Sequence, residues 1–303
     1  MGRRRIVTRA YAKLNLDLRV LGRRADGLHE LRTIYQSIEL ADCLTVTVRP
    51  GPFELRCSDP AVPVDRRNLA WAAAVRASRA VGRGTPRDLS VFIDKRIPVE
   101  AGLGGGSADA AAMLHALTRL WPGELSASVC RRIASRIGSD VPFFLVGGTV
   151  LGLGAGDELF PLVDLPTHWA VVLIPTFGVP TASAYGWFDL APRRVRPVLS
   201  REPLAVRAGA LSLVGKLVND LEPAVTAKYP EVRRMKAALR RAGADHPSMS
   251  GSGSCVFGLF SRRRDATAAA AVLRRQAWRV VVARTLSRED IISRESGCPR
   301  GAG

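Results

Sequence analysis

The sequence has no apolar run that approaches the roughly 20 residues needed to cross a bilayer. Its basic start, MGRRRIVTRAYAKLNL, lacks an apolar core of signal-peptide length, and Ile6 stands where a myristoylation signal has Ser or Thr. The ending CPRGAG is not a prenylation motif. With 47% hydrophobic and 24% charged residues, the chain is therefore expected to be a cytoplasmic globular protein with no membrane partner.

Residues that bind metals or form disulfides are also few. The five cysteines include no C-x-x-C pair, and the four histidines are scattered along the 303 residues. This pattern argues against a zinc centre and against a disulfide framework, and it fits a reducing compartment.

Lysine is scarce as well, although the net charge is +18: of 45 basic residues, five are lysines and the others are arginines. Such a charge permits nucleic-acid binding. However, the clusters Arg3–Arg5, Arg193–Arg196 and Arg262–Arg264 contain no interleaved aromatic residues, so nucleic acid is an unlikely partner. An anionic small substrate accounts for the same sign of charge.

Residues 10–20 alternate between apolar and polar side chains, which predicts a strand with one dry face. Lys13, Asn15 and Asp17 share the polar face, which is either solvated or the wall of a site. Further strands are expected at 44–48, 89–93, 143–153, 170–174, 254–260 and 279–283. Helices are expected at 110–121, 129–137 with a cap at Gly138, 181–188, 232–239 and 265–276. This order predicts an α+β fold of two domains, 1–163 and 164–303.

The stretch PVEAGLGGGSADAA places glycines directly before a helix. Glycine lets backbone N–H groups approach a ligand, and a helix start presents unpaired donors, so the stretch predicts a phosphate cradle. Ser107 could cap the helix or reach a phosphate oxygen or its Mg²⁺, and Asp109 should point away. A flexible turn is the alternative. The stretch fits neither the P-loop nor the Rossmann fingerprint.

Three separated motifs resemble the GHMP small-molecule kinases: AYAKLNL, IPVEAGLGGGSADAA and MSGSGSCVF. Four longer segments resemble the members that act on 4-diphosphocytidyl-2-C-methyl-D-erythritol: AKLNLDLRVLGRRADGLHEL, NLAWAAA, GSDVPFFLVGGTVLGLGAGDEL and NDLEPAV. The resemblance runs in order from about Arg9 to Phe260. It implies a two-domain α+β fold with ATP and the acceptor in the interdomain cleft. It also implies use of ATP and Mg²⁺ to phosphorylate the 2-hydroxyl of that substrate in non-mevalonate isoprenoid synthesis.

The same resemblance implies roles for single residues. Asp140 matches the catalytic aspartate, which takes the proton of the acceptor hydroxyl or orients it. Lys13 matches the active-site lysine, which would neutralise the transferring phosphoryl group and help to keep Asp140 ionised. Asn15 is expected to contact the acceptor.

The resemblance assigns the remaining site residues to two groups. The ATP-binding group is Asn68, Lys95, Gly102, Leu103, Gly104, Gly105, Gly106 and Ser107. For two of them a structural role stays open, a helix cap for Asn68 and a charge at a strand end for Lys95. The substrate-binding group is Asn15, His29, Thr181, Tyr185, Gly251 and Gly253. His29 would read the cytosine edge, and Tyr185 would either stack on cytosine or pack a loop.

One position departs from the pattern of the relatives. They usually read A-D-G-Y-H, whereas this chain has Leu28 before His29, which removes an aromatic face and a hydroxyl. Weaker cytidine binding is expected, and another GHMP kinase acting on a different small alcohol is the alternative. A nucleic-acid-binding protein that retains the fold is a third hypothesis. The protein is expected to be a monomer or a homodimer.

Overall fold

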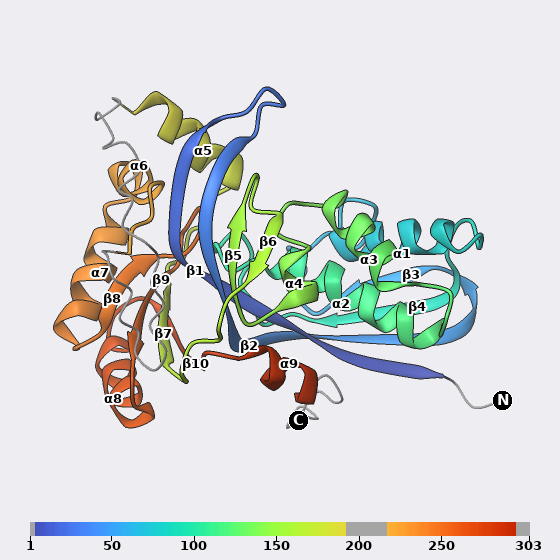
Figure 1. The fold of residues 1–303 in the computed structure, drawn as a ribbon. Coiled ribbons are helices and arrows are strands. Elements are labelled where there is room, and N and C mark those ends of the chain that lie inside the picture. The colour runs from blue at the N-terminus through green and yellow to red at the C-terminus, as the bar shows by residue number, and fades with distance from the viewer. Residues whose placement is uncertain (1–3, 192–216, 295–303) are drawn as a thin grey trace.

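The computed structural model describes residues 4–191 and 217–294. Two sheets organise these ranges (Figure 1). The first has the order β3-β4-β2-β5-β6, with β1 paired to β2, and the second has the order β10-β7-β9-β8. The chain is therefore α+β, as predicted. The arginine cluster at 193–196 lies outside the described residues.

Two long strands, β1 (Arg5–Arg23) and β2 (His29–Pro52), form the centre of the first sheet. They pair antiparallel along their length, and the other edge of β2 is divided between two partners. Its C-terminal half pairs with β4 (Arg87–Asp94), and its Thr33–Gln36 segment pairs with β5 (Thr149–Leu153). The edges are β3 (Glu54–Cys57), which is parallel to β4, and β6 (Glu158–Pro161).

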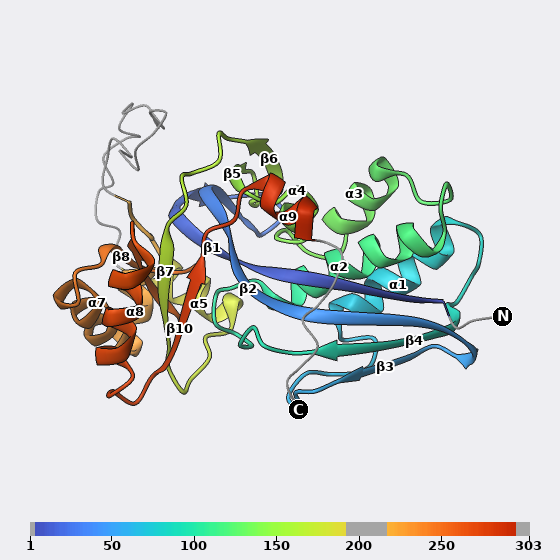
Figure 2. The same ribbon diagram turned by 90° about the horizontal axis from the view of Figure 1, so that it is seen from below.

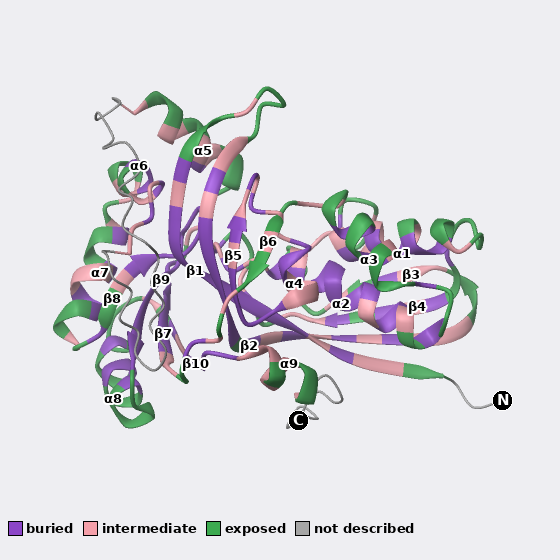
Figure 3. Cartoon of the chain, in the orientation of Figure 1, coloured by how far each residue is buried: buried purple, intermediate pink, exposed green. Residues whose placement is uncertain are grey.

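Helices α1 (Leu69–Ala80), α2 (Gly105–Leu120) and α3 (Ala127–Ser135) lie against one face of this sheet (Figures 1 and 2). The buried stripe of α1 is made almost entirely of alanines, and α2 contributes several more. Small side chains let the two helices approach each other closely, while their outer residues face solvent (Figure 3). The short α4 (Phe143–Val146) continues this layer.

The second sheet consists of β7 (Trp169–Ile174), β8 (Asp245–Met249), β9 (Val256–Phe260) and β10 (Arg279–Arg284). Its helices are α5 (Thr181–Leu190), α6 (Glu222–Lys228), α7 (Glu231–Arg241) and α8 (Arg263–Leu273). The last helix, α9 (Arg288–Arg294), lies near β2 of the first sheet instead (Figures 1 and 2). The predicted domain division at residue 163 stays a prediction.

Several predicted boundaries are wrong. The helix predicted to end at Gly138 ends at Ser135, and the strand predicted over 143–153 is helix α4 followed by β5. Helix α2 begins at Gly105 and is capped by the left-handed Gly104, so Ser107 is not its N-cap. Cys57, Cys130 and Cys255 are free thiols. Within the described ranges no helix is long and apolar enough to cross a membrane.

Candidate active site

A cavity of about 460 Å³ lies where β1, the glycine-rich loop before α2 and the loop after β8 meet. The contacts between these segments explain why it forms there. The carbonyl of Leu103 accepts the N–H of Lys13, and that of Ala101 accepts the N–H of Cys255. Ser250 donates its hydroxyl to the Gly102 carbonyl at 2.9 Å. Three motifs that are far apart in the sequence therefore enclose one space.

The polar face of β1 is buried and forms one wall of this cavity. The side chain of Lys13 is 5% exposed, and its Nζ donates to Asn15 Oδ1 and lies 3.6 Å from Asp140 Oδ2. Asn15 donates to Thr33 Oγ1 at 2.7 Å, which fixes its amide. Asp17, farther along the same face, accepts the backbone N–H of Val218. Burial raises the pKa of Asp17.

Asp140 enters the cavity from the turn between α3 and α4. Its side chain is 34% exposed, so a substrate could reach one oxygen. The other oxygen, Oδ1, accepts the hydroxyl of Tyr35 at 3.0 Å. Sequence reasoning missed Tyr35, because a tyrosine in a strand carries no signal until the register places it opposite Asn15.

Glycines shape the loop before α2 for different reasons. Gly102 and Gly104 have positive φ angles of 75° and 72°. A Cβ at Gly102 would lie 2.0 Å from the carbonyl oxygen of Ser250, and one at Gly104 would lie 2.6 Å from the ring of Phe144. Protein packing therefore requires both glycines. The first turn of the 16-residue helix α2 faces the cavity, which suits an anion.

Gly106 is different, because the protein leaves room for a side chain there. Its nearest neighbour would be Leu69 Cδ1, at an ordinary contact distance of 3.7 Å. Gly106 and Ser107 both line the cavity. A bound ligand that approaches the backbone would account for glycine at this position.

Beneath this turn lies a buried group of three charged residues. Lys95 Nζ contacts Asp42 Oδ2 at 2.6 Å and Asp109 Oδ2 at 2.7 Å. Burial opposes the ammonium, but the two carboxylates outweigh it and raise the pKa of Lys95. Burial and the charge of Asp42 raise the pKa of Asp109 to about 8 against the opposing effect of Lys95. Asp109 turns toward Lys95, and both residues also line the cavity.

Asn68 has the structural role that the sequence left open, the cap of α1. Its Oδ1 caps α1 by accepting the N–H of Ala70 at 2.8 Å, and its Nδ2 donates to the carbonyl of Pro63. The residue also lines the cavity, together with Arg67 and Leu69.

The loop after β8 closes the cavity from the second sheet. A Cβ at Gly251 would lie 3.0 Å from Asn15 Oδ1 and 3.1 Å from Lys13 Nζ, so this backbone passes directly over the polar face of β1. Asn219 donates to the carbonyls of Met249 and Gly251 at 2.8 and 2.7 Å and thereby fixes the loop. Gly253 packs against Met249 and is not among the described residues that line the cavity.

Of the predicted acceptor residues outside β1 and the loop after β8, two line the cavity and His29 does not. Thr181 and Tyr185, both on α5, line the cavity, and Thr181 Oγ1 lies 3.2 Å from the hydroxyl of Ser252. The ring of Tyr185 stacks on His29 with the centroids 4.7 Å apart. His29 lies beyond the cavity lining and pairs with Asp189 at 2.8 Å. Leu28 beside it is 53% exposed.

Known proteins resemble this chain in sequence and in fold. Residues 68–148 match the family model described as GHMP kinases N terminal domain, and residues 204–279 match the one described as GHMP kinases C terminal. A 4-diphosphocytidyl-2-C-methyl-D-erythritol kinase of Moorella thermoacetica is 42% identical over 281 residues, which cover 91% of this chain and 98% of that protein. The chain belongs to the GHMP kinase family.

Other GHMP kinases extend the comparison. The enzyme of the same name from Solibacter usitatus is 44% identical over 270 residues, which cover 84% of this chain and 81% of that protein. A crystal structure of 4-(cytidine 5'-diphospho)-2C-methyl-D-erythritol kinase superposes with a TM-score of 0.77 at 36% identity, covering 92% of this chain and 99% of that one. The mevalonate kinase of L. major has a TM-score of 0.72 at 16% identity over 95% of this chain and 96% of that one, which shows a shared fold.

No group of three His, Cys, Asp or Glu residues that could hold a metal occurs in residues 4–191 and 217–294. Mg²⁺ in phosphoryl-transfer sites needs only one or two protein oxygens, because substrate phosphates and water supply the rest. The hydroxyl of Ser107, in the cavity lining, fits that requirement.

Proposed function

We propose that this chain is an ATP-dependent kinase that phosphorylates the 2-hydroxyl of 4-diphosphocytidyl-2-C-methyl-D-erythritol, a step of non-mevalonate isoprenoid synthesis. The observation that carries the proposal is the Lys13–Asp140 pair, 3.6 Å apart, in the same cavity as the first turn of α2. The curated relatives of that name, which match most of the chain, supply the acceptor.

The transfer itself needs positioning and charge neutralisation more than covalent chemistry. In the proposed mechanism, the backbone N–H groups at Gly105 and Gly106 hold the ATP phosphates at the positive end of α2. Asp140 accepts a hydrogen bond from the acceptor hydroxyl and takes its proton as that oxygen attacks the γ-phosphorus. Lys13 stabilises the negative charge on the transferring phosphoryl group.

Mg²⁺, when bound with ATP, would neutralise charge on the phosphate oxygens. Ser107 is the residue that we propose to hold it. Asn68 and Lys95 would line the nucleotide end of the cavity. Asn15, Thr181, Tyr185 and the backbone at Gly251 would contact the acceptor.

Acceptor specificity tests the function directly. Purified protein is assayed for ADP release with ATP, Mg²⁺ and the cytidyl substrate, in parallel with homoserine, mevalonate and galactose. Turnover with the cytidyl substrate alone supports the proposal. Turnover with only one of the other alcohols would show that the proposed acceptor is wrong, while the proposed kinase mechanism would stand.

Replacing Asp140 by Asn tests the role of that carboxylate. Turnover should be lost while ATP still binds, because the amide cannot accept the hydroxyl proton. Asp265→Asn, an exposed acid at the start of α8, serves as the control and should leave turnover unchanged. Near-normal turnover of Asp140→Asn would contradict the assignment.

A second candidate, a GHMP kinase for a different small alcohol, is favoured by Leu28 alone. An exposed leucine stands there in place of the tyrosine usual among the relatives. The acceptor panel separates the two candidates.

A further inference from the structure

Tyr35 is a buried titratable group that the proposed mechanism does not use. The residue is 2% exposed and lies in β2, yet its hydroxyl reaches the cavity. It lies 3.0 Å from Asp140 Oδ1 and 3.3 Å from the carbonyl oxygen of Gly156. Lys13 Nζ lies 5.6 Å from the centre of its ring. One side chain therefore contacts Asp140 directly and lies close to the lysine that pairs with it.

The slot around Tyr35 is shaped to hold it. A Cβ at Gly156 would lie 2.4 Å from the Tyr35 hydroxyl, and one at Gly152 would lie 2.7 Å from its ring. The ring of Phe143 packs against Tyr35 with the centroids 4.8 Å apart. Because Phe143 follows Asp140 by three residues, this packing also fixes the segment that carries the carboxylate.

We propose that Tyr35 is a positioning residue that holds Asp140 in its productive orientation. The hydroxyl has one proton and two acceptors, and an ionised carboxylate is the stronger acceptor. Donation to Oδ1 fixes the carboxylate plane and leaves Oδ2, on the side of Lys13, for the acceptor hydroxyl. The inference rests on the proposed function, because it assigns Asp140 the role of base.

The environment keeps Tyr35 a donor. Burial and then the charge of Asp140 raise the pKa of Tyr35 well above its usual range, so the phenol keeps its proton at neutral pH. Lys13, Tyr185 and Asp157 are the other titratable groups close to this pair, and the pKa of Tyr185 is raised mainly by burial.

Tyr35→Phe tests the proposal, because it removes the hydroxyl and keeps the ring. The expected result is a fall of about tenfold in kcat, the usual scale for a hydrogen bond to a charged group, with the KM for ATP and for the acceptor within about twofold. Tyr11→Phe is the matched control: Tyr11 is a buried β1 tyrosine whose hydroxyl accepts from Arg9 at 3.3 Å, and its loss should leave kcat unchanged. Melting temperatures of both variants show whether the fold is intact.

Crystal structures of the wild type and Tyr35→Phe give a readout that depends on no substrate. Asp140 should turn away from its wild-type orientation in the variant. An unchanged carboxylate together with an unchanged kcat would overturn the proposal, as would equal losses of kcat in the Tyr11 control. If the wild type phosphorylates only a rival alcohol, the proposed substrate fails, and kcat with that alcohol then tests Tyr35.

Discussion

Asp109 is a buried acid in the first turns of α2, and its carboxylate faces a lysine. A carboxylate beside a phosphate cradle would repel the ligand, but this one turns toward Lys95, 2.7 Å away. Asp42 binds the same ammonium through Oδ2, and its Oδ1 accepts the backbone N–H groups of Arg96 and Ile97. One lysine thus faces two acids, and burial makes the second negative charge costly.

The pH dependence of stability should reflect this pair of acids. The pKa of Asp109 is about 8 in the folded chain and near 3.8 when unfolded, so its contribution is complete below pH 4 and is lost as the pH rises to 8. Asp109→Asn imitates the protonated acid and should make the free energy of unfolding fall less steeply between pH 5 and 8.5 than in the wild type. Chemical denaturation at several pH values measures it.

Asp65→Asn provides the comparison for that experiment. The side chain of Asp65 is half exposed, and its hydrogen bonds with Arg67 lower its pKa to about 2, so it does not titrate in this range. Its variant should keep the wild-type slope. A wild-type slope in Asp109→Asn would show that Asp109 stays ionised in the fold.

At the scale of elements, the first turn of α2 is the part of the site that could be predicted best from the sequence. The glycine run before an alanine-rich segment predicted a helix start that faces a ligand, and the helix does begin there. What the run could not show is which glycines the protein itself needs. Gly102 and Gly104 avoid collisions with Ser250 and Phe144, partners that only the folded chain brings near.

Gly106→Ala should therefore separate ligand binding from stability. The protein leaves space for the methyl group, and alanine favours a helix, so the free energy of unfolding should stay the same or rise by up to about 1 kcal/mol. The KM for ATP should rise on the order of tenfold, or about 1.4 kcal/mol, if phosphate approaches this backbone. Steady-state kinetics and denaturation measure the two effects.

Gly186→Ala is the matched control in α5, where nothing lies within 4 Å of the added carbon. It should gain similar stability and keep the wild-type KM for ATP. An unchanged KM for ATP in Gly106→Ala would place the phosphates elsewhere.

Elements with a regular pattern could be predicted, and irregular ones could not. The alternation in β1 and the continuous apolar run of β7 both predicted strands correctly. The bounds of β7 are right to one residue, whereas β1 extends from Arg5 to Arg23, beyond the predicted 10–20 at both ends. The apolar Phe143–Val146 segment looks β-like, but Gly147 and Gly148, both with positive φ, separate it as helix α4. Tyr35 and Asp42 could not be recognised as site residues, because their contacts with Asp140 and Lys95 join parts of the chain 105 and 53 residues apart.

At the scale of the whole molecule, the cavity depends on contacts that join the two sheets. Asn219 forms a bridge with Leu18 of β1 and also holds the loop that carries Gly251. On the other side, Thr285 forms a bridge with Ile38 of β2, and α9 follows. The chain thus returns to its first sheet after completing the second.

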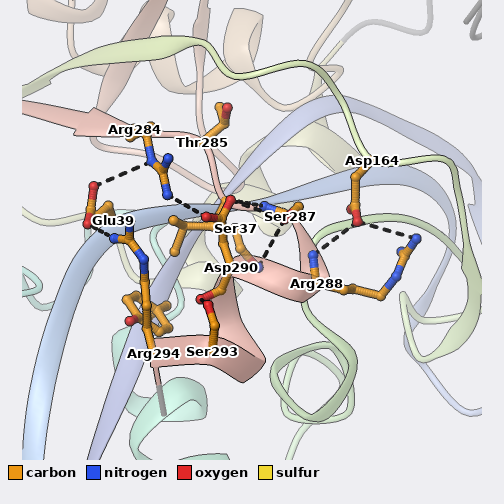
Figure 4. A network of polar contacts seen from close by, with 12 residues as sticks. Ser37, Glu39, Asp164, Arg284, Thr285, Ser287, Arg288, Asp290, Ser293 and Arg294 are labelled. Atoms are coloured by element: carbon orange, nitrogen blue, oxygen red, sulfur yellow. Dashed lines mark hydrogen bonds and ion pairs between the residues drawn. The ribbon is translucent and has the colours of Figure 1, made fainter. Parts of the chain in front are cut away.

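Polar contacts attach α9 to the first sheet, and Figure 4 shows them. Arg288 donates to the carbonyls of Leu162 and Thr149 at 2.7 and 3.2 Å, and its backbone N–H donates to Asp164 at 3.0 Å. Arg294 pairs with Glu39 near the end of the helix. Arg288 therefore satisfies backbone carbonyls, whereas Arg294 forms a pair that is about one-third exposed.

Arg288→Met should lower the free energy of unfolding by about 1–2 kcal/mol, because it removes the side-chain donor to the partly buried Leu162 carbonyl and one of two donors to the Thr149 carbonyl. The variant keeps the aliphatic stem over Gly148. Arg294→Met should cost no more than about 0.5 kcal/mol, since water and salt screen a surface pair. Urea denaturation of both variants measures the difference. Equal losses would mean that the apolar contact of Ile291 with Gly147 holds α9 in place. The polar contacts of Figure 4 would then orient the helix without adding to the free energy of unfolding.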